Sequence, residues 1–377
     1  MRVETVKHEG LHVLRGISML LVLLAHLSLP STILSKISKH LVNPFYWGAE
    51  LFLMLSGFLI TQSIIYGHTQ SIRVFLVKRI FRIYPPLLIY MGIAFITNFI
   101  VYNTIPISNA NKFIILIPNK FFYNSIYLLS TFSHLFNHDL GYHYGQMWSV
   151  VIEVQYYVFI AFIGILLFRK YGEIVLTTIY IIFLCLVCLM RISNGFQLFW
   201  LSGTILQYLV NMNVDFIAVG GLLAVWWSKR VNLDSQPLGH SPLYITAATG
   251  AACIILMFLP SPLGNSPNRY FNHIYILFIT VYIFTQILPY PIVKRNIISR
   301  FFLYLGDISY SVYLYHFTIF VVIWWISSLF IPFVFYKTLM FEITQLVGLV
   351  GIVLISSRIL IAIERKSITV GYNLFLR

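Results

Sequence analysis

Charged residues are scarce in this sequence. They make up 10% of its 377 residues, and hydrophobic residues make up 59%. A soluble domain carries about 25% charged residues, so this chain has too few to cover a surface that faces water. The solvent must therefore be lipid. The composition excludes an ordinary soluble protein and predicts a single transmembrane helix bundle, with about 20 residues in each span.

Cysteines are also few, and all three lie in apolar stretches. Cys185 and Cys188 form a C-x-x-C pair, and Cys253 stands alone. A redox pair is one interpretation, but a helix at lipid depth favours packing, because reactive thiolates need a polar environment. No small-residue cleavage site follows the first apolar run, so residues 11–29 are expected to be a retained span.

Apolar runs of spanning length set the predicted topology. Ten such runs fall at about 11–29, 46–66, 83–102, 148–168, 173–190, 213–228, 242–259, 270–288, 303–327 and 338–361. If the N-terminus is cytoplasmic, the inside segments hold 17 lysines and arginines and the outside segments hold 7. This bias predicts an all-α polytopic bundle with both termini cytoplasmic. It also attributes the net charge of +14 to topology and anionic lipid rather than to nucleic acid.

Ionisable side chains inside the predicted spans carry the functional signal, because a charge at lipid depth costs several kcal/mol. The chain has only 11 carboxylates. Four of them lie in or at the edge of a predicted span: Glu50, Glu153, Asp215 and Asp307. A buried ion-pair network that fixes helix packing is one explanation. A water-filled cavity that contains catalytic groups is the other explanation.

Arg15 and His26 both belong to the first predicted span and are eleven residues apart. On a helix they point in directions within about 20° of each other, with a rise of about 16 Å between them. One cavity would then hold a cation near its cytoplasmic end and an imidazole near its outer end. That arrangement suits a long ligand such as the arm of coenzyme A. Histidine is the usual general base at neutral pH, and Glu50 or Glu153 could orient its ring.

Basic residues gather just before the third span. Lys78, Arg79 and Arg82 lie within about one helical turn of one another and can converge on one anion. The guanidinium group of arginine can donate two parallel hydrogen bonds to two phosphate oxygens. Binding of the phosphates of coenzyme A is therefore one interpretation. Ordinary anchoring on the cytoplasmic side is the alternative.

Five blocks of sequence occur in an order and spacing that resemble the acyltransferase 3 family of integral-membrane O-acyltransferases, which modify bacterial surface polysaccharides. The blocks are LRGI at 14–17 with His26, GAELF at 48–52 with LSGFLI at 55–60, KRIFRIYP at 78–85, WS at 148–149 with Glu153 and QYY at 155–157, and LGDISYS at 305–311 with YLYH at 313–316. The resemblance covers most of the chain. It implies one acyltransferase domain over residues 1–377, with no fused extracellular esterase-like domain.

The resemblance also implies roles for single residues. His26, Glu50 and Glu153 would be catalytic; Arg15, Lys78, Arg79 and Arg82 would hold the donor; Trp148, Tyr156, Tyr310 and His316 would line the site. The donor would be acyl-CoA, most commonly acetyl-CoA, used as a substrate. The acceptor would be a hydroxyl group of a glycan or polysaccharide on the outer side of a bacterial inner membrane. No metal is expected, and no pattern indicates an oligomeric state.

Two departures from the family pattern and three rival interpretations remain. Asp307 stands where the family would have a basic or neutral residue, and Val154 replaces a second glutamate. His134 and His138 in the long outer loop have a spacing that could chelate zinc, although no further ligand set accompanies them.

A proton-coupled transporter is the main rival, because intramembrane carboxylates and histidines also relay protons. The internal repeat typical of many transporters is not evident. A structural subunit would not need the buried charges.

Overall fold

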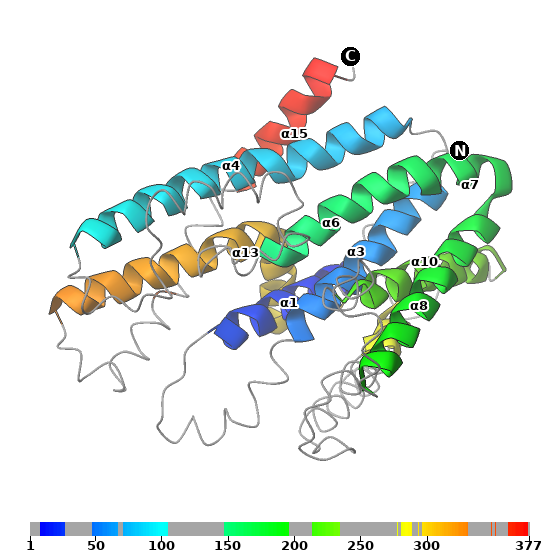
Figure 1. Ribbon diagram of the computed structural model, residues 1–377, viewed down its shortest axis with the longest axis horizontal. Coiled ribbons are helices and arrows are strands. Elements are labelled where there is room, and N and C mark those ends of the chain that lie inside the picture. Colours follow the sequence, from blue (N-terminus) through cyan, green and yellow to red (C-terminus); the bar gives the residue numbers. More distant parts are fainter. Residues whose placement is uncertain are drawn as a thin grey trace. The chain divides into compact units, whose positions relative to one another are not determined.

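The computed structural model describes residues 8–26, 47–66, 71–104, 147–195, 213–233, 280–288, 296–330 and 361–375, together with residues 277, 293, 348 and 351. Within these ranges all the regular secondary structure is helical (Figure 1), as predicted. The elements are α1 (Glu9–His26), α3 (Trp47–Tyr66), α4 (Ile72–Thr104), α6 (Trp148–Phe159), the π-helix η3 (Ile160–Ile165), α7 (Leu166–Tyr171), α8 (Glu173–Gly195), α10 (Val214–Leu233), α13 (Ile297–Phe330) and α15 (Ile361–Phe375).

Four stretches in the described part of the chain are long and apolar enough to cross a bilayer. They are Gly48–Tyr66, Ile72–Thr104, Trp148–Phe168 and Ile297–Ile323. The surface of α4 fits this role, because Ile89, Ile93, Ile96 and Ile100 recur at helical spacing and are 39–59% exposed. Such a continuous aliphatic stripe is unfavourable in water and favourable in lipid. These helices are those of an integral membrane protein.

Four of the predicted spans, 46–66, 83–102, 148–168 and 303–327, overlap the helices that are long and apolar enough to cross a bilayer. The predicted spans 46–66 and 148–168 match α3 and the stretch from α6 to α7 within one residue at their N-terminal ends. The predicted span 83–102 lies inside α4, which begins eleven residues earlier, so the basic segment is continuous with this span. The predicted span 242–259 and most of the outer loop lie outside the described residues, so the count of ten spans stays a prediction.

The chain forms two compact units. The first contains α3, α8 and α10, with α1 up to Leu24 and α13 up to Asp307. The second contains α4, α6, η3 and α15, with α13 from Ile308 onward.

Helices α3 and α10 of the first unit pack with their backbones in close approach, and two glycines make this possible. A Cβ atom added to Gly57 would overlap the carbonyl oxygen of Ile217, and one added to Gly220 would overlap that of Met54. Small residues allow membrane helices to approach in this way, because packing rather than exclusion of water holds them together. The pair is further joined to α8, where Tyr180 OH lies 2.6 Å from the hydroxyl of Thr61 on α3.

The start of α1 is fixed by His8. Its Nδ1 accepts the backbone N–H of Leu11 at 3.3 Å, and its Nε2 lies 2.9 Å from the carbonyl oxygen of Leu288. Both contacts require a neutral ring with the proton on Nε2. Burial lowers the pKa of His8, which favours this neutral form, although the hydrogen bonds oppose the shift. On the same helix His12 Nδ1 lies 3.5 Å from Asp307, so the unexpected Asp307 has a partner inside its own unit.

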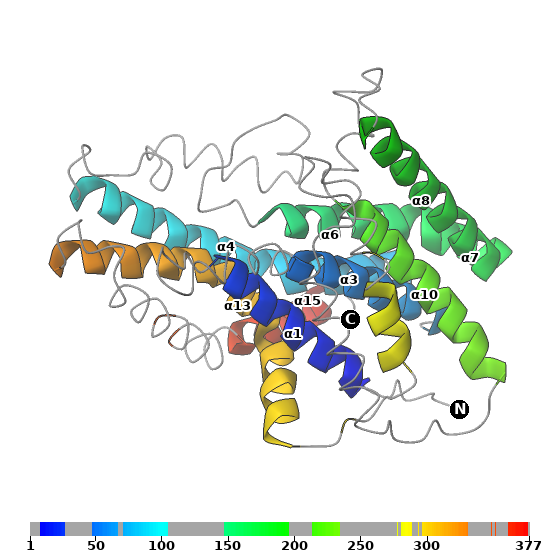
Figure 2. The same ribbon diagram turned by 90° about the horizontal axis from the view of Figure 1, so that it is seen from below.

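In the second unit α4 and α13 lie side by side and run in the same direction, as Figures 1 and 2 both show. Three pairs of residues connect them in the same order along each helix. Tyr310 donates a hydrogen bond to the carbonyl of Ile83 at 2.9 Å, Tyr315 packs edge-on against Tyr90 with centroids 5.4 Å apart, and Trp325 Nε1 donates to Thr104 Oγ1 at 2.8 Å. This parallel pair, with α6 and α15 against α4, holds the candidate site.

Candidate functional site

A carboxylate, a tyrosine and an arginine meet where α6 approaches α4. Glu153 and Tyr157 are four residues apart on α6, so both lie on one helix face, and the tyrosine hydroxyl donates a hydrogen bond to Glu153 Oε1. The guanidinium of Arg79 on α4 stacks over the rings of Tyr157 and Phe75, at 5.1 Å and 5.6 Å from their centroids. Cation–π contacts of this kind contribute about 0.5–1 kcal/mol at exposed sites and more where water is excluded. They fix the position of Arg79 beside Tyr157, the residue that bonds to the carboxylate.

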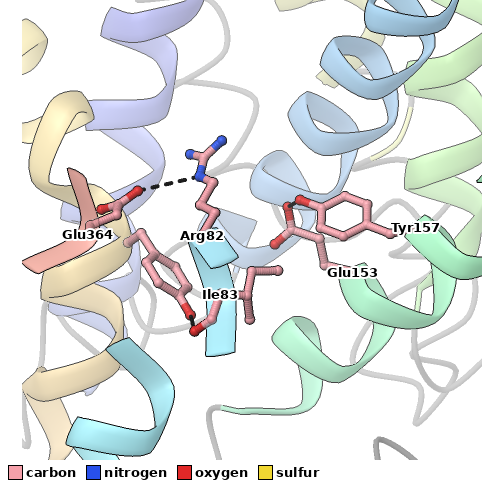
Figure 3. A network of polar contacts seen from close by, with 6 residues as sticks. Arg82, Ile83, Glu153, Tyr157 and Glu364 are labelled. Atoms are coloured by element: carbon pink, nitrogen blue, oxygen red, sulfur yellow. Dashed lines mark hydrogen bonds and ion pairs between the residues drawn. The ribbon is translucent and has the colours of Figure 1, made fainter. Parts of the chain in front are cut away.

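One helical turn further along α4, Arg82 lies between two carboxylates. Its Nε is 3.4 Å from Glu364 Oε1 on α15, and Glu153 and Tyr157 on α6 also interact with it electrostatically. Figure 3 shows Arg82 with Glu364 on one side and Glu153 on the other. Two arginines one turn apart are therefore held by ring faces and carboxylates on neighbouring helices. This arrangement can bind an anionic group that approaches α4.

Two prolines shape the helix at this position. Pro85 and Pro86 lie inside α4 and have no N–H groups, so the carbonyls of Phe81 and Arg82 lose their usual helical donors. The next carbonyl, that of Ile83, accepts the hydroxyl of Tyr310. The helical donor of that carbonyl is Leu87, which keeps its N–H, so the bond from Tyr310 is an additional one and does not replace a donor lost to the prolines. The two carbonyl groups without helical donors beside Arg82 are therefore a consequence of the local sequence.

The next turns of α13 carry two further candidate residues. Tyr313 OH lies 2.7 Å from Ser149 Oγ at the start of α6. His316 is fully buried, and its Nδ1 lies 2.7 Å from the carbonyl oxygen of Tyr313. A carbonyl can only accept, so Nδ1 donates in this contact. The ring packs against Tyr313, Phe317 and Phe320.

The predicted catalytic, donor-binding and site-lining residues that lie in the second unit belong to this cluster or flank it. Arg79, Arg82, Glu153 and Tyr310 interact with one another directly or through Tyr157. Lys78 is exposed on α4, one turn before Arg82. Trp148 is the first residue of α6, and Tyr156 is buried on the same helix.

The remaining predicted site residues are Glu50, Arg15 and His26, on α3 and α1. Glu50 is buried in the first turn of α3 in the first unit, where Asn213 donates a hydrogen bond to its Oε1 at 3.1 Å. Asn213 has a φ of 52°, a left-handed conformation that asparagine tolerates, and it directly precedes α10. Arg15 and His26 both lie on α1, which is helical over the eleven-residue interval that their predicted alignment needs. The side chain of His26 lies outside the described part of the structure.

Two residues of the cluster were not predicted as site residues. Tyr157 stands four residues after Glu153, and this spacing alone could have indicated the contact. Glu364 follows the last apolar run and precedes Arg365 and Lys366, a pattern that predicts a cytoplasmic tail. The structure places it on α15, against the basic face of α4.

Comparison with known proteins decides the family. The acyltransferase 3 family model, described as an acyltransferase domain, matches residues 8–362. The chain belongs to the acyltransferase 3 family. An uncharacterised protein of Haemophilus influenzae (strain ATCC 51907 / DSM 11121 / KW20 / Rd) is 32% identical over 199 residues, which cover 50% of this chain and 78% of that protein. No solved structure matches. The resemblance read from the five blocks is thus confirmed, and the protein is an acyltransferase of the membrane.

Proposed function

We propose that this member of the acyltransferase 3 family transfers an acyl group from acyl-CoA to a hydroxyl of a glycan. The proposed acyl group is acetyl. The donor would bind from the cytoplasm, and the acceptor would approach from the outer side of a bacterial inner membrane. The observation that carries the donor half is the placement of Arg79 and Arg82 one turn apart, each held by groups on α6 or α15. Arginine forks in fixed positions are suited to the phosphates of coenzyme A.

The proposed orientation places both termini and the basic end of α4 in the cytoplasm, within a bundle of about ten spans. Lysines and arginines of the sequence support this orientation through their excess on the inside segments. The phosphates would then stay at the cytoplasmic surface while the thioester reaches toward the outer half. Arg15 on α1 would lie along that path. The rise of the helix places it about 16 Å closer to the cytoplasm than His26.

The proposed chemistry is direct transfer with His26 as general base. The imidazole removes the proton of the acceptor hydroxyl while its oxygen attacks the thioester carbonyl. The carbon–sulfur bond then breaks, and the departing thiolate of coenzyme A takes the proton from the imidazolium. Glu50 and Glu153 are the two candidates to stabilise the charged ring. Trp148, Tyr156, Tyr310 and His316 are proposed to line the site, and no metal is required.

The test uses the purified protein in nanodiscs with radiolabelled acetyl-CoA and a panel of methyl hexosides and oligosaccharides. Wild type is expected to bind acetyl-CoA and to release coenzyme A with at least one acceptor. His26→Ala should bind the donor with unchanged affinity and show no turnover. His8→Gln, at the residue just before the same helix, is the control for loss of an imidazole and should retain turnover. If wild type shows no affinity for acetyl-CoA, the enzyme assignment fails, and a proton-coupled transporter of a small or lipid-linked solute becomes the function to test.

A further inference from the structure

The contact between Arg82 and Glu364 joins residues 282 positions apart in the sequence. The two side chains are 31% and 15% exposed, so the pair is partly shielded from water and its interaction is less screened than that of a surface pair. Glu364 is one of only 11 carboxylates in the chain. A carboxylate beside a group that must bind an anion weakens that binding unless it has another effect, so its position needs an explanation.

Helix α15 is fixed against α4 independently of this ion pair. The rings of Phe81 and Phe375 are 5.4 Å apart, and Gly371 lies so close to Phe81 that an added Cβ would overlap the ring. Glu364, Gly371 and Phe375 follow one face of α15 at helical spacing. Glu364 is therefore presented to Arg82 by a docked helix and not by a loose chain end.

The ion pair with Glu364 leaves the two terminal nitrogens of the Arg82 guanidinium available to a ligand. Glu364 approaches Nε at 3.4 Å, and the two terminal nitrogens point away from it (Figure 3). A guanidinium has five N–H donors, and its two terminal nitrogens form a fork that matches two phosphate oxygens. A carboxylate at Nε attracts that edge of the group without occupying the fork.

Arg82 also experiences a competing attraction. Glu153, together with the hydroxyl of Tyr157, lies on the α6 side of Arg82 and attracts the same guanidinium. If Glu364 were absent, the side chain would be drawn toward Glu153, and the fork would turn toward α6. The opposing carboxylate on α15 balances this pull.

We propose that Glu364 is a positioning residue that holds the guanidinium of Arg82 in the orientation needed to bind a phosphate group of the acyl donor. This inference rests on the proposed function. It adds a residue outside the five sequence blocks and gives the C-terminal helix α15 a role in donor binding. Glu364 itself does not contact the donor.

The experiment measures the equilibrium dissociation constant of coenzyme A for the full-length protein in nanodiscs. Glu364→Gln is expected to weaken binding about tenfold, because the carboxamide is neutral and no longer opposes the pull of Glu153. Glu364→Asp, which keeps the charge, should recover part of the loss. Glu173→Gln is the matched control: it removes the same charge from a carboxylate that accepts a bond from Ser228, and it should leave binding unchanged.

A second pair of variants separates positioning from a general structural effect. In the Arg82→Gln background, adding Glu364→Gln should cause no further loss, since the only role of the carboxylate is to orient Arg82. An additive loss would show that α15 supports the fold in some other way and would overturn the inference. Tighter binding by Glu364→Gln would show that the carboxylate competes with phosphate, and unchanged binding would show that it does not act on Arg82. If wild type binds no coenzyme A, the proposed function fails first, and this role fails with it.

Discussion

The hydrogen bond between Tyr157 and Glu153 allows the site to be tested one interaction at a time. Tyr157→Phe removes the hydroxyl that donates to Glu153 and keeps the ring over which Arg79 stacks. The substitution therefore deletes one hydrogen bond within α6 and leaves the cation–π contact in place. The partner variant Glu153→Met removes the acceptor with little change of volume.

The expected magnitude follows from the environment of the pair. A hydrogen bond to a charged group contributes about 1.5–3 kcal/mol net. Hydrogen bonds between membrane helices, the nearest comparison in lipid for this bond within α6, couple by about 0.6 kcal/mol on average and about 1.7 kcal/mol at most. Tyr157 is buried and Glu153 is partly buried, so the upper part of the membrane range applies. We expect the two substitutions to couple by about 1.5 kcal/mol.

The assay is reversible unfolding in bicelles by added SDS, followed by tryptophan fluorescence, for wild type, both single variants and the double variant. The free energies of unfolding should be non-additive by the predicted coupling. Tyr171→Phe, an exposed tyrosine on α7, serves as the control for loss of a hydroxyl and should change little. If the Tyr157 and Glu153 effects add within about 0.3 kcal/mol, the reasoning about this bond is refuted.

Three further outcomes follow from the structure. Tyr310→Phe removes the bond to the carbonyl of Ile83 and should lower the free energy of unfolding by about 1 kcal/mol in the same assay, whereas an unchanged value would mean that water replaces the hydroxyl. Gly57→Leu should reduce the folded yield sharply, because its side chain meets the backbone of α10, and a fully stable variant would contradict the close approach. Burial lowers the pKa of His8 below its ordinary value of 6.5, so the unfolded chain binds a proton more readily; stability should fall as pH decreases through 6.5, and His8→Gln should abolish this dependence in pH-resolved melts.

Much of the local structure was predictable because it depends on short-range patterns. The apolar runs predict α3 and the stretch that contains α6, since a segment in lipid must satisfy its own backbone hydrogen bonds. The pairing of Glu153 with Tyr157 depends on a four-residue spacing that any helix imposes. The basic turn of α4 was likewise evident, because helical geometry alone brings Arg79 and Arg82 close together.

Contacts between distant segments could not be derived in the same way. Nothing in the sequence around Glu364 indicates that it reaches Arg82, because the pairing depends on how α15 packs on α4. The same applies to Asn213, whose bond to Glu50 depends on the close packing of α3 and α10. Such contacts are set by tertiary packing, and local spacing carries no information about them.

Arg79 and Arg82 are proposed to bind the phosphates of the donor together. The most direct test of this proposal is the affinity of coenzyme A for wild type and for two double variants that lose the same charge. Arg79→Gln/Arg82→Gln should weaken binding about a hundredfold, because each lost charge-assisted bond contributes about 1.5 kcal/mol or more. Arg365→Gln/Lys366→Gln, on the exposed face of α15, should weaken it by less than about threefold because only screened surface charge is lost. Equal losses in the two double variants, or none in either, would contradict the account.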